Sequence, residues 1–241
     1  MLDKATMKLQ KLTESQNGPS RRRYEDACGT AHALDLIGER WALLVMRELM
    51  LGPKRFGDLR ADLPGISANV LTQRLEGLEE AGIVVRRMLP PPSSVQVYEL
   101  TEWGYQSRPI MGALGRWATR SPGHDTNQHM SAVSLLLSFQ AMGQPTLGKD
   151  IDAKIGFRLG RENYVLGIDH GMIDPKRGDP AEADVVFTGS PRAIAAAVYG
   201  GVPLETLEAE GALTVTGDRA LAERFRTLFP LPPKAGVAAA G

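Results

Sequence analysis

Residues 64–82 constrain the fold of this chain more than any other segment. Pro64-Gly65 marks a tight turn, Ser67 is a favourable N-cap for a helix, and Gly82 is suited to end that helix. Between these boundaries three leucines recur at helical spacing: Leu71, Leu75 and Leu78. The sequence therefore predicts a helix over residues 67–81 that buries one face and exposes a polar one.

The flanking segments predict what this helix packs against. Apolar residues at helical spacing predict three shorter helices before it, at residues 31–37, 40–51 and 55–63. After it, residues 83–89 and residues 95–100 are β-rich, and the proline-rich residues 90–94 form a turn between them. This pattern predicts a β-hairpin. Thr101 then caps a final helix. Together these elements predict a winged helix-turn-helix over residues 24–120.

The exposed face of the 67–81 helix has the chemistry of a DNA-recognition helix. Its first half offers polar side chains and no acidic ones: Ser67, Asn69, Thr72, Gln73 and Arg74. The acidic side chains lie in the second half: Glu76, Glu79 and Glu80. A helix that enters the major groove by its N-terminal half needs this gradient, since phosphates repel carboxylates. We therefore predict that the first half contacts double-stranded DNA. The alternative is an ordinary surface helix.

Charge is distributed unevenly although the net charge is zero. Residues 1–123 carry 17 Lys and Arg against 14 Asp and Glu, and residues 124–241 carry 11 against 14. The imbalance is consistent with a DNA-binding half joined to another kind of half. Residues 1–23 are polar and end in three arginines, Arg21–Arg23, so we expect a mobile arm. Those arginines are either a solvated charge run or a contact to phosphates.

The cysteine content and the apolar runs bear on the compartment. Cys28 is the one cysteine, which excludes an intramolecular disulfide and a Cys-rich zinc site. The N-terminus lacks the apolar core of a signal peptide, and no run approaches the roughly 20 apolar residues of a membrane-spanning helix. We expect a cytoplasmic protein with no membrane partner.

Residues 121–130 are small and polar, and we interpret them as a linker to a second domain over residues 131–229. That domain is predicted to begin with an apolar helix over residues 132–142 and two strands over residues 152–159 and 164–169. After a loop it is predicted to continue with a strand, two helices, a strand and a last helix: residues 184–188, 191–199, 204–210, 212–216 and 218–228. The proline- and alanine-rich residues 230–241 are predicted to form a frayed tail. The fold class is therefore α+β.

Catalytic and cofactor motifs are missing from the sequence. The four histidines are scattered, and no Gly-x-Ser-x-Gly elbow occurs. Residues 143–150 match a phosphate loop except at Asp150, where Ser or Thr is needed, and they follow a helix rather than a strand. We therefore expect no enzyme activity, no cofactor and no metal.

Residues 24–120 resemble the HxlR family of winged-helix regulators. The resemblance rests on Cys28 and on these motifs: ALDLIGERW (33–41), RFGDL (55–59), PGIS (64–67), LTQRL (71–75) and YELT (98–101). It implies a homodimer that reads an inverted repeat with half-sites about one helical turn apart, anchored by Trp103 and Trp117. It also implies that Arg55 grips the DNA backbone. The predicted hairpin, which is the wing, departs from the family pattern because its tip at residues 90–94 carries no Lys or Arg. Its basic residues lie only at its base: Arg86 and Arg87.

Residues 130–229 resemble the sterol-carrier-protein fold. The matching stretches are IGF (155–157), RENY (161–164), ADV (183–185), TGSP (188–191), GG (200–201) and GALTVTGD (211–218). The resemblance implies a cavity for an apolar small molecule, such as a fatty acid or a sterol-like compound. Six residues are predicted to line it: Phe157, Tyr164, Ile168, Phe187, Ala196 and Tyr199. The alternative is a filled core.

Cys28 has two interpretations. Some members of the HxlR family use a cysteine at this place as a redox or electrophile sensor, which requires a lowered thiol pKa. The other interpretation, which we favour, is a small buried apolar residue.

Three functions follow from these patterns. The first is a dimeric transcriptional regulator whose DNA binding responds to an apolar ligand in the C-terminal domain. The second is a regulator that senses oxidants or electrophiles through Cys28. The third is a lipid carrier or enzyme-accessory protein whose winged helix mediates protein contacts.

Overall fold

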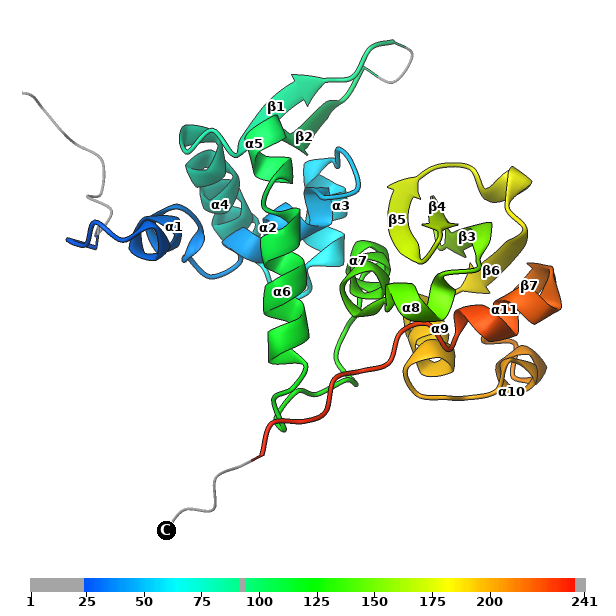
Figure 1. Cartoon of the computed structure of the whole chain (residues 1–241). Helices are drawn as coiled ribbons and strands as arrows, with labels where there is room; N and C mark the ends of the chain where they lie inside the picture. The colour runs from blue at the N-terminus through cyan, green and yellow to red at the C-terminus, as the bar shows by residue number, and fades with distance from the viewer. Residues whose placement is uncertain (1–23, 92–93, 237–241) are drawn as a thin grey trace, which may run out of the picture.

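The structure is a computed structural model that describes residues 24–91 and 94–236. The N-terminal arm with Arg21–Arg23, the wing-tip residues 92–93 and the tail residues 237–241 lie outside the described residues. Figure 1 shows a helical N-terminal unit (residues 24–120) with a projecting hairpin, beside a C-terminal unit (residues 131–229) built on a sheet. None of the described helices is long and apolar enough to cross a membrane.

The N-terminal unit has the predicted element order. Its elements are α1 (Gly29–Ile37), α2 (Ala42–Leu49), α3 (Phe56–Asp62), α4 (Ala68–Glu80), β1 (Val84–Met88), β2 (Gln96–Leu100), α5 (Glu102–Tyr105) and α6 (Arg108–Ala118). The Ser67 hydroxyl caps α4 by accepting from the Val70 N–H at 3.2 Å, and Gly82 adopts a φ of +70° just beyond the helix. The local signals therefore placed the start and end of this helix correctly.

The helix expected after Thr101 is two helices rather than one. Thr101 caps α5 through the N–H of Gly104, and the chain then breaks before α6. Pro109 lies in the first turn of α6, where its missing N–H is tolerated. In the interior of a continuous helix its ring would clash with the preceding turn, so the second helix has to start anew.

One hydrophobic cluster holds the N-terminal unit together. The inward leucines of α4 pack against α2 and the hairpin, with Val45, Leu49, Leu59 and Leu100 among the buried residues. Leu44, which precedes the buried Val45 in α2, is exposed.

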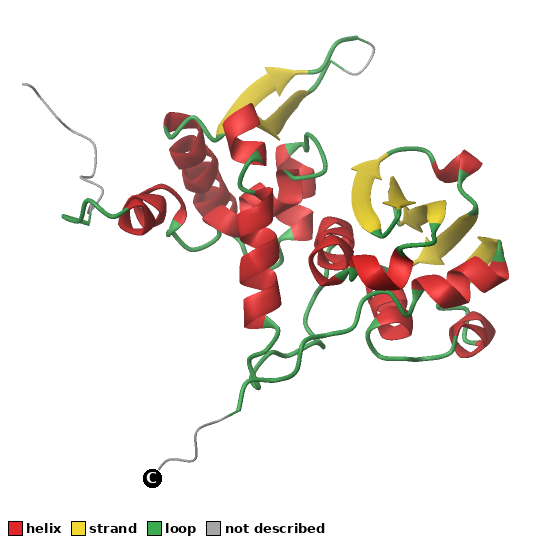
Figure 2. Ribbon diagram, viewed as in Figure 1, coloured by secondary structure: helices red, strands yellow, loops and turns green. Residues whose placement is uncertain are grey.

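The C-terminal unit is a five-stranded sheet covered by helices on one face (Figure 2). Its elements are α7 (Ala132–Met142), α8 (Pro145–Gly148), β3 (Asp152–Leu159), β4 (Glu162–Asp169), β5 (Met172–Arg177), the 3₁₀ turn η1 (Pro180–Glu182), β6 (Val185–Gly189), α9 (Pro191–Val198), α10 (Leu204–Ala209), β7 (Leu213–Gly217) and α11 (Arg219–Phe225). The strand order is β5-β4-β3-β6-β7, in which only β3 and β6 run parallel.

Strand β5 is absent from the sequence-based prediction, which had a loop there. The strand contains Pro175, which cannot donate to a ladder and is therefore confined to edge positions. β5 is an edge strand that pairs only with β4, so the proline is accommodated. A strand so placed is recognisable only once its neighbours are known.

The two units pack directly against each other. Helix α7 contacts α6 and α2 of the N-terminal unit as well as β5 and α9 of its own. Leu51, just after α2, belongs to the hydrophobic cluster of the C-terminal unit, and Leu137 of α7 packs on the other cluster. Residues 121–130 therefore connect two units that are packed against each other.

The described part of the tail is ordered against the end of α6, contrary to the prediction that it frays. The Ala235 N–H donates to the Arg120 carbonyl, and the Lys234 ammonium donates to the carbonyls of Thr119 and Ser121 at 3.0 and 3.1 Å. Figure 1 shows this red segment returning to the base of α6. The prediction failed because these contacts join segments that are far apart in sequence, which local composition does not reveal.

A substitution at Gly156 of β3 tests how tightly η1 packs against the sheet. A Cβ there would lie 2.5 Å from Pro180 and 3.0 Å from Ala183, so Gly156→Ala should lower the free energy of unfolding by about 1–3 kcal/mol. The matched control is Gly167→Ala in β4, where a Cβ meets nothing closer than 4.0 Å. Urea denaturation measures both, and an equal effect of the two substitutions would contradict this packing.

Candidate functional site

The first half of α4 presents an exposed polar surface. Ser67, Asn69, Thr72 and Gln73 are all exposed, while the leucines on the opposite side are buried. The cap contributed by Ser67 fixes where the helix starts, and so fixes the direction in which the other three side chains project. Three of the five residues predicted on this helix, Asn69, Thr72 and Gln73, therefore share one exposed face, and Ser67 is exposed at the start of the helix.

Arg74, the fifth, is turned away from that face. Its side chain is 19% exposed and lies 3.3 Å from the Glu39 carboxylate, which precedes α2. The helical pattern could not reveal this partner, because Glu39 is distant in sequence. Arg74 therefore ties α4 to the α1–α2 turn.

The other predicted basic residues differ in availability. Arg55 is exposed at the N-cap of α3 and has no carboxylate partner among the described residues. Arg86 in β1 pairs with Glu79 at 2.8 Å, and Arg87 pairs with Glu99 at 3.1 Å. The base of the wing is thus largely neutralised by carboxylates, whereas Arg55 is free to meet a phosphate.

A large apolar surface is left uncovered on α5 and α6. Trp117 is 70% exposed, and none of the residues of α6 is buried. The uncovered side chains on this surface, which we call the α6 outer face, are Trp103, Ile110, Leu114 and Trp117. Ile110, Leu114 and Trp117 recur at helical spacing, so these three lie on one side of α6.

Cys28 is exposed at the N-cap of α1, so the favoured prediction of a buried cysteine is wrong. The backbone N–H of Thr30 is the main cause that lowers the pKa of the thiol, followed by the Thr30 hydroxyl and the N–H of Ala31. The helix start thus supplies unpaired N–H groups that favour the thiolate.

The six residues predicted to line a ligand cavity lie in or beside the core of the C-terminal unit. Phe157 and Phe187 stack at 5.7 Å between ring centroids, and Phe225 of α11 lies within 6 Å of both. Tyr164 and Ile168 are buried as well, whereas Ala196 and Tyr199 are half-buried. None of the six lines the cavity of about 600 Å³ that lies between α6 and α7.

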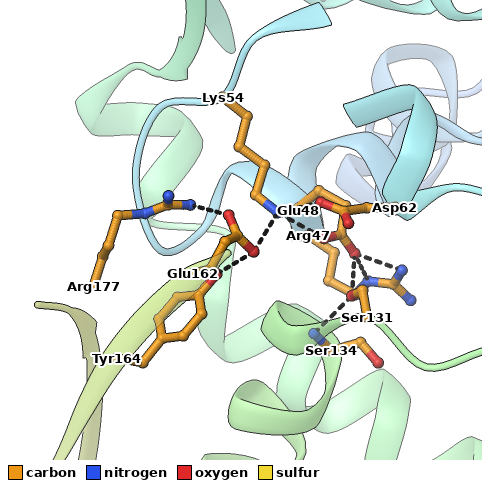
Figure 3. A network of polar contacts seen from close by, with 9 residues as sticks. All are labelled: Arg47, Glu48, Lys54, Asp62, Ser131, Ser134, Glu162, Tyr164 and Arg177. Carbon is orange, nitrogen blue, oxygen red and sulfur yellow. Dashed lines mark hydrogen bonds and ion pairs between the residues drawn. The ribbon is translucent and has the colours of Figure 1, made fainter. Parts of the chain in front are cut away.

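A buried polar network joins the two units, and sequence analysis missed it (Figure 3). Glu48 of α2 is 0% exposed and accepts from the Arg47 guanidinium at 2.7 and 2.9 Å. It also accepts from the hydroxyl of Ser131, the N-cap of α7, at 2.7 Å. Glu48 therefore ties α2 to the first residue of the C-terminal unit. One sequence signal could have revealed this network: Glu48 follows Val45 by three residues, which places a carboxylate on the apolar face of the helix.

Lys54 is the second member of this network. Its side chain is 1% exposed, its ammonium contacts Asp62 of α3, and it lies 3.4 Å from Glu48 and 3.5 Å from Glu162 of β4. Burial alone would lower the pKa of Lys54, but the three carboxylates outweigh it and the pKa is raised. Lys54 is therefore protonated and shared between the two units.

The carboxylates respond differently to this environment. Burial raises the pKa of Asp62 even though Lys54 lies against it. Burial also acts to raise the pKa of Glu162, but Lys54, the Tyr164 hydroxyl and Arg177 together lower it. Glu162 is thus held ionised at the strand end, where it meets the N-terminal unit.

Comparisons with known proteins agree with both halves of this architecture. Residues 36–125 match the HxlR-like helix-turn-helix family. The HTH-type transcriptional regulator YvaP of Bacillus subtilis, itself uncharacterized, is 38% identical over 87 residues, which span 36% of this chain and 81% of that protein. The chain belongs to the HxlR-like helix-turn-helix family. It is a transcriptional regulator of HxlR type, and residues 139–230 match the SCP-2 sterol transfer family.

Two further comparisons concern the HxlR-type half. The HTH-type transcriptional regulator YodB of Bacillus subtilis is 38% identical over 86 residues, which span 36% of this chain and 77% of that protein. A solved structure of reduced YodB is 35% identical, covers 41% of this chain and 98% of that chain, and superposes with a TM-score of 0.37.

Lys54 should be critical for holding the SCP-2 domain on the HxlR-type domain. Lys54→Met leaves three carboxylates without their shared cation, so the free energy of unfolding should fall by about 3–5 kcal/mol near pH 7. The control Lys149→Met removes an exposed ammonium and should change it by less than about 0.5 kcal/mol. Urea denaturation measures both.

The deficit of Lys54→Met should shrink as the pH falls. Asp62 already has a raised pKa, and losing Lys54 raises it further, so mild acid protonates the carboxyl and removes the unpaired buried charge. Acid also weakens the intact ion pairs of the wild-type protein. Its free energy of unfolding therefore falls toward that of Lys54→Met, which further narrows the difference between the two proteins. A deficit that grows in acid would show that the carboxylates do not carry the effect.

Proposed function

We propose that this chain is a dimeric transcriptional regulator that reads an inverted-repeat operator with the first half of α4 and responds to a small ligand through its SCP-2 domain. The observation that carries the proposal is the exposed, acid-free polar face of α4 at the start of a capped helix in a winged-helix fold. An α-helix fits the major groove, where polar side chains distinguish base edges.

The side chains divide into readers and anchors. Asn69, Thr72 and Gln73 read base edges, because they project together beyond the cap. Ser67 and Arg55 contact phosphates and set the register. The other three arginines predicted to contact DNA are each paired with a carboxylate, so each would bind DNA only if a phosphate replaced that carboxylate: Arg74, Arg86 and Arg87.

A second copy of the chain covers the α6 outer face. Two such faces related by a two-fold axis bury Trp103 and Trp117 and place two α4 helices for half-sites about one helical turn apart. In this arrangement residues 24–120 bind DNA and dimerise, residues 121–130 connect, and residues 131–229 sense the ligand.

Ligand sensing follows from the packing of the two units. A ligand that favours one arrangement of α7 on α6 alters the geometry of the dimer and so its affinity for the operator. A difference of about 1–3 kcal/mol in operator binding between the two states is enough for regulation.

DNA reading is tested by fluorescence anisotropy on duplexes selected from a random pool by the wild-type protein, across a salt series. Gln73→Ala should cost about 1–3 kcal/mol on the selected sequence and reduce discrimination against its variants. Arg55→Gln should weaken all duplexes alike and make the salt slope shallower by about one.

The control for these variants is Arg158→Gln, which makes the same charge change at an exposed position of β3 and should leave binding unchanged. Selection that enriches no inverted repeat would count against sequence reading by α4. The lipid-carrier function, in which the winged helix contacts proteins, would then be favoured.

A second candidate function is redox sensing, which the exposure and lowered pKa of Cys28 favour. Cys28→Ser should leave basal operator affinity unchanged and abolish its response to a quinone or to diamide. Operator binding with and without each oxidant measures this. A response that persists in Cys28→Ser eliminates the cysteine as the sensor, since the chain has no other.

A further inference from the structure

The cavity of about 600 Å³ between α6 and α7 lies at the junction of the two units. One wall is α6 of the HxlR-type domain, and the other is α7 of the SCP-2 domain, with Met130 and His124 from the connecting segment. Its volume is within the range of about 300–1,000 Å³ that is usual for small-molecule sites. We call it the junction cleft.

The walls of the junction cleft are mostly apolar. Met111 of α6 and Leu137 and Met142 of α7 line it. Two glycines of α6, Gly112 and Gly115, also face it and leave the helix bare there. A Cβ on Gly115 would meet nothing within 4 Å, so open space adjoins this position rather than packed side chains. The cleft can therefore take an apolar chain or ring.

The charged residues of the cleft are all basic. Its described lining includes Arg47, Arg108 and Arg116, and no Asp or Glu. Arg47 is held by Glu48, outside the lining, and Arg108 donates to Gln140 at 2.7 Å and lies 3.9 Å from Asp174.

Arg116 differs from the other two arginines. Its Nε donates to the Ala141 carbonyl at 3.0 Å, and it forms no ion pair within the described part of the chain. The guanidinium is thus anchored by one N–H while its terminal nitrogens are left for another acceptor. A half-buried guanidinium beside an apolar wall is suited to a carboxylate, which it can bind through two parallel hydrogen bonds.

We propose that the junction cleft binds an amphiphilic carboxylic acid, with its carboxylate on Arg116 and its apolar part between α6 and α7. The proposal rests on ligand sensing as proposed above and moves the site out of the SCP-2 core, where Phe157, Phe187 and Phe225 pack together. The ligand is anionic because Arg116 forms no ion pair among the described residues, whereas Arg47 and Arg108 lie beside Glu48 and Asp174.

The position of the cleft explains how such a ligand would act on DNA binding. Residues 108, 112, 115 and 116 of α6 face the cleft, while Ile110, Leu114 and Trp117 form the opposite, outer face. One helix thus contacts the ligand on one side and the second copy of the chain on the other. A shift of α6 upon binding changes the dimer geometry directly.

The test is isothermal titration calorimetry of the full-length protein with dodecanoate below its micellar concentration, and with dodecan-1-ol as the uncharged match. Arg116→Gln should weaken dodecanoate binding about tenfold or more and leave dodecanol binding unchanged, since only the acid uses the charge. Arg158→Gln, the matched control, should affect neither.

A second variant keeps the test independent of charge. Gly115→Leu fills the open space, and leucine is the better helix former, so the variant should fold and lose both ligands. If dodecanoate binds the wild-type protein but neither variant weakens it, the site lies elsewhere, and ligand sensing in general survives. If dodecanoate does not bind the wild-type protein at all, the proposal is overturned. Operator binding measured without ligand then decides the regulator function separately.

Discussion

The buried ammonium of Lys54 is the interaction on which the joined architecture depends. It lies among three carboxylates, two from the N-terminal unit and Glu162 from the sheet of the C-terminal unit. Removing these charges from water is costly, and their mutual attraction offsets that cost only in one geometry. Apolar packing between α7 and α6 would tolerate sliding, because it is not directional. The network opposes such sliding because its contacts are directional, so it specifies the docking of the two units more than it stabilises either of them.

Sequence patterns predicted the elements that are specified locally. The leucines of α4, the cap at Ser67 and the turn at Gly82 are signals contained within a few residues, and the structure places all of them as expected. The edge strand β5 escaped, because Pro175 makes the segment read as a loop until β4 is known to lie beside it. Local signals therefore give element identity, whereas edge strands depend on pairing partners.

The side chains of the candidate site divide in the same way. Asn69 and Gln73 could be placed on an exposed face because helical periodicity decides it. The inward turn of Arg74 toward Glu39 depends on a contact between separate helices, which periodicity does not contain. Phe157 and Phe187, which were expected to line a cavity, pack against Phe225 from the last helix in the core of the C-terminal unit. A sequence shows which residues are apolar, but only the assembled fold shows whether they leave a space.

The arrangement of α6 gives a physical basis for coupling between the two units. A regulator needs an element that both sites contact, since a ligand shifts an equilibrium only by its differential affinity for two states. Helix α6 meets α7 on one side and exposes Trp117 on the other, while Arg120 at its end binds the returning tail. Helix α6 is thus contacted along one side by α7 and at its end by the tail, while its outer face stays exposed. A change in how α7 is seated against α6 would therefore reach α6 directly, while the Glu48–Ser131 contact holds the start of α7 on α2.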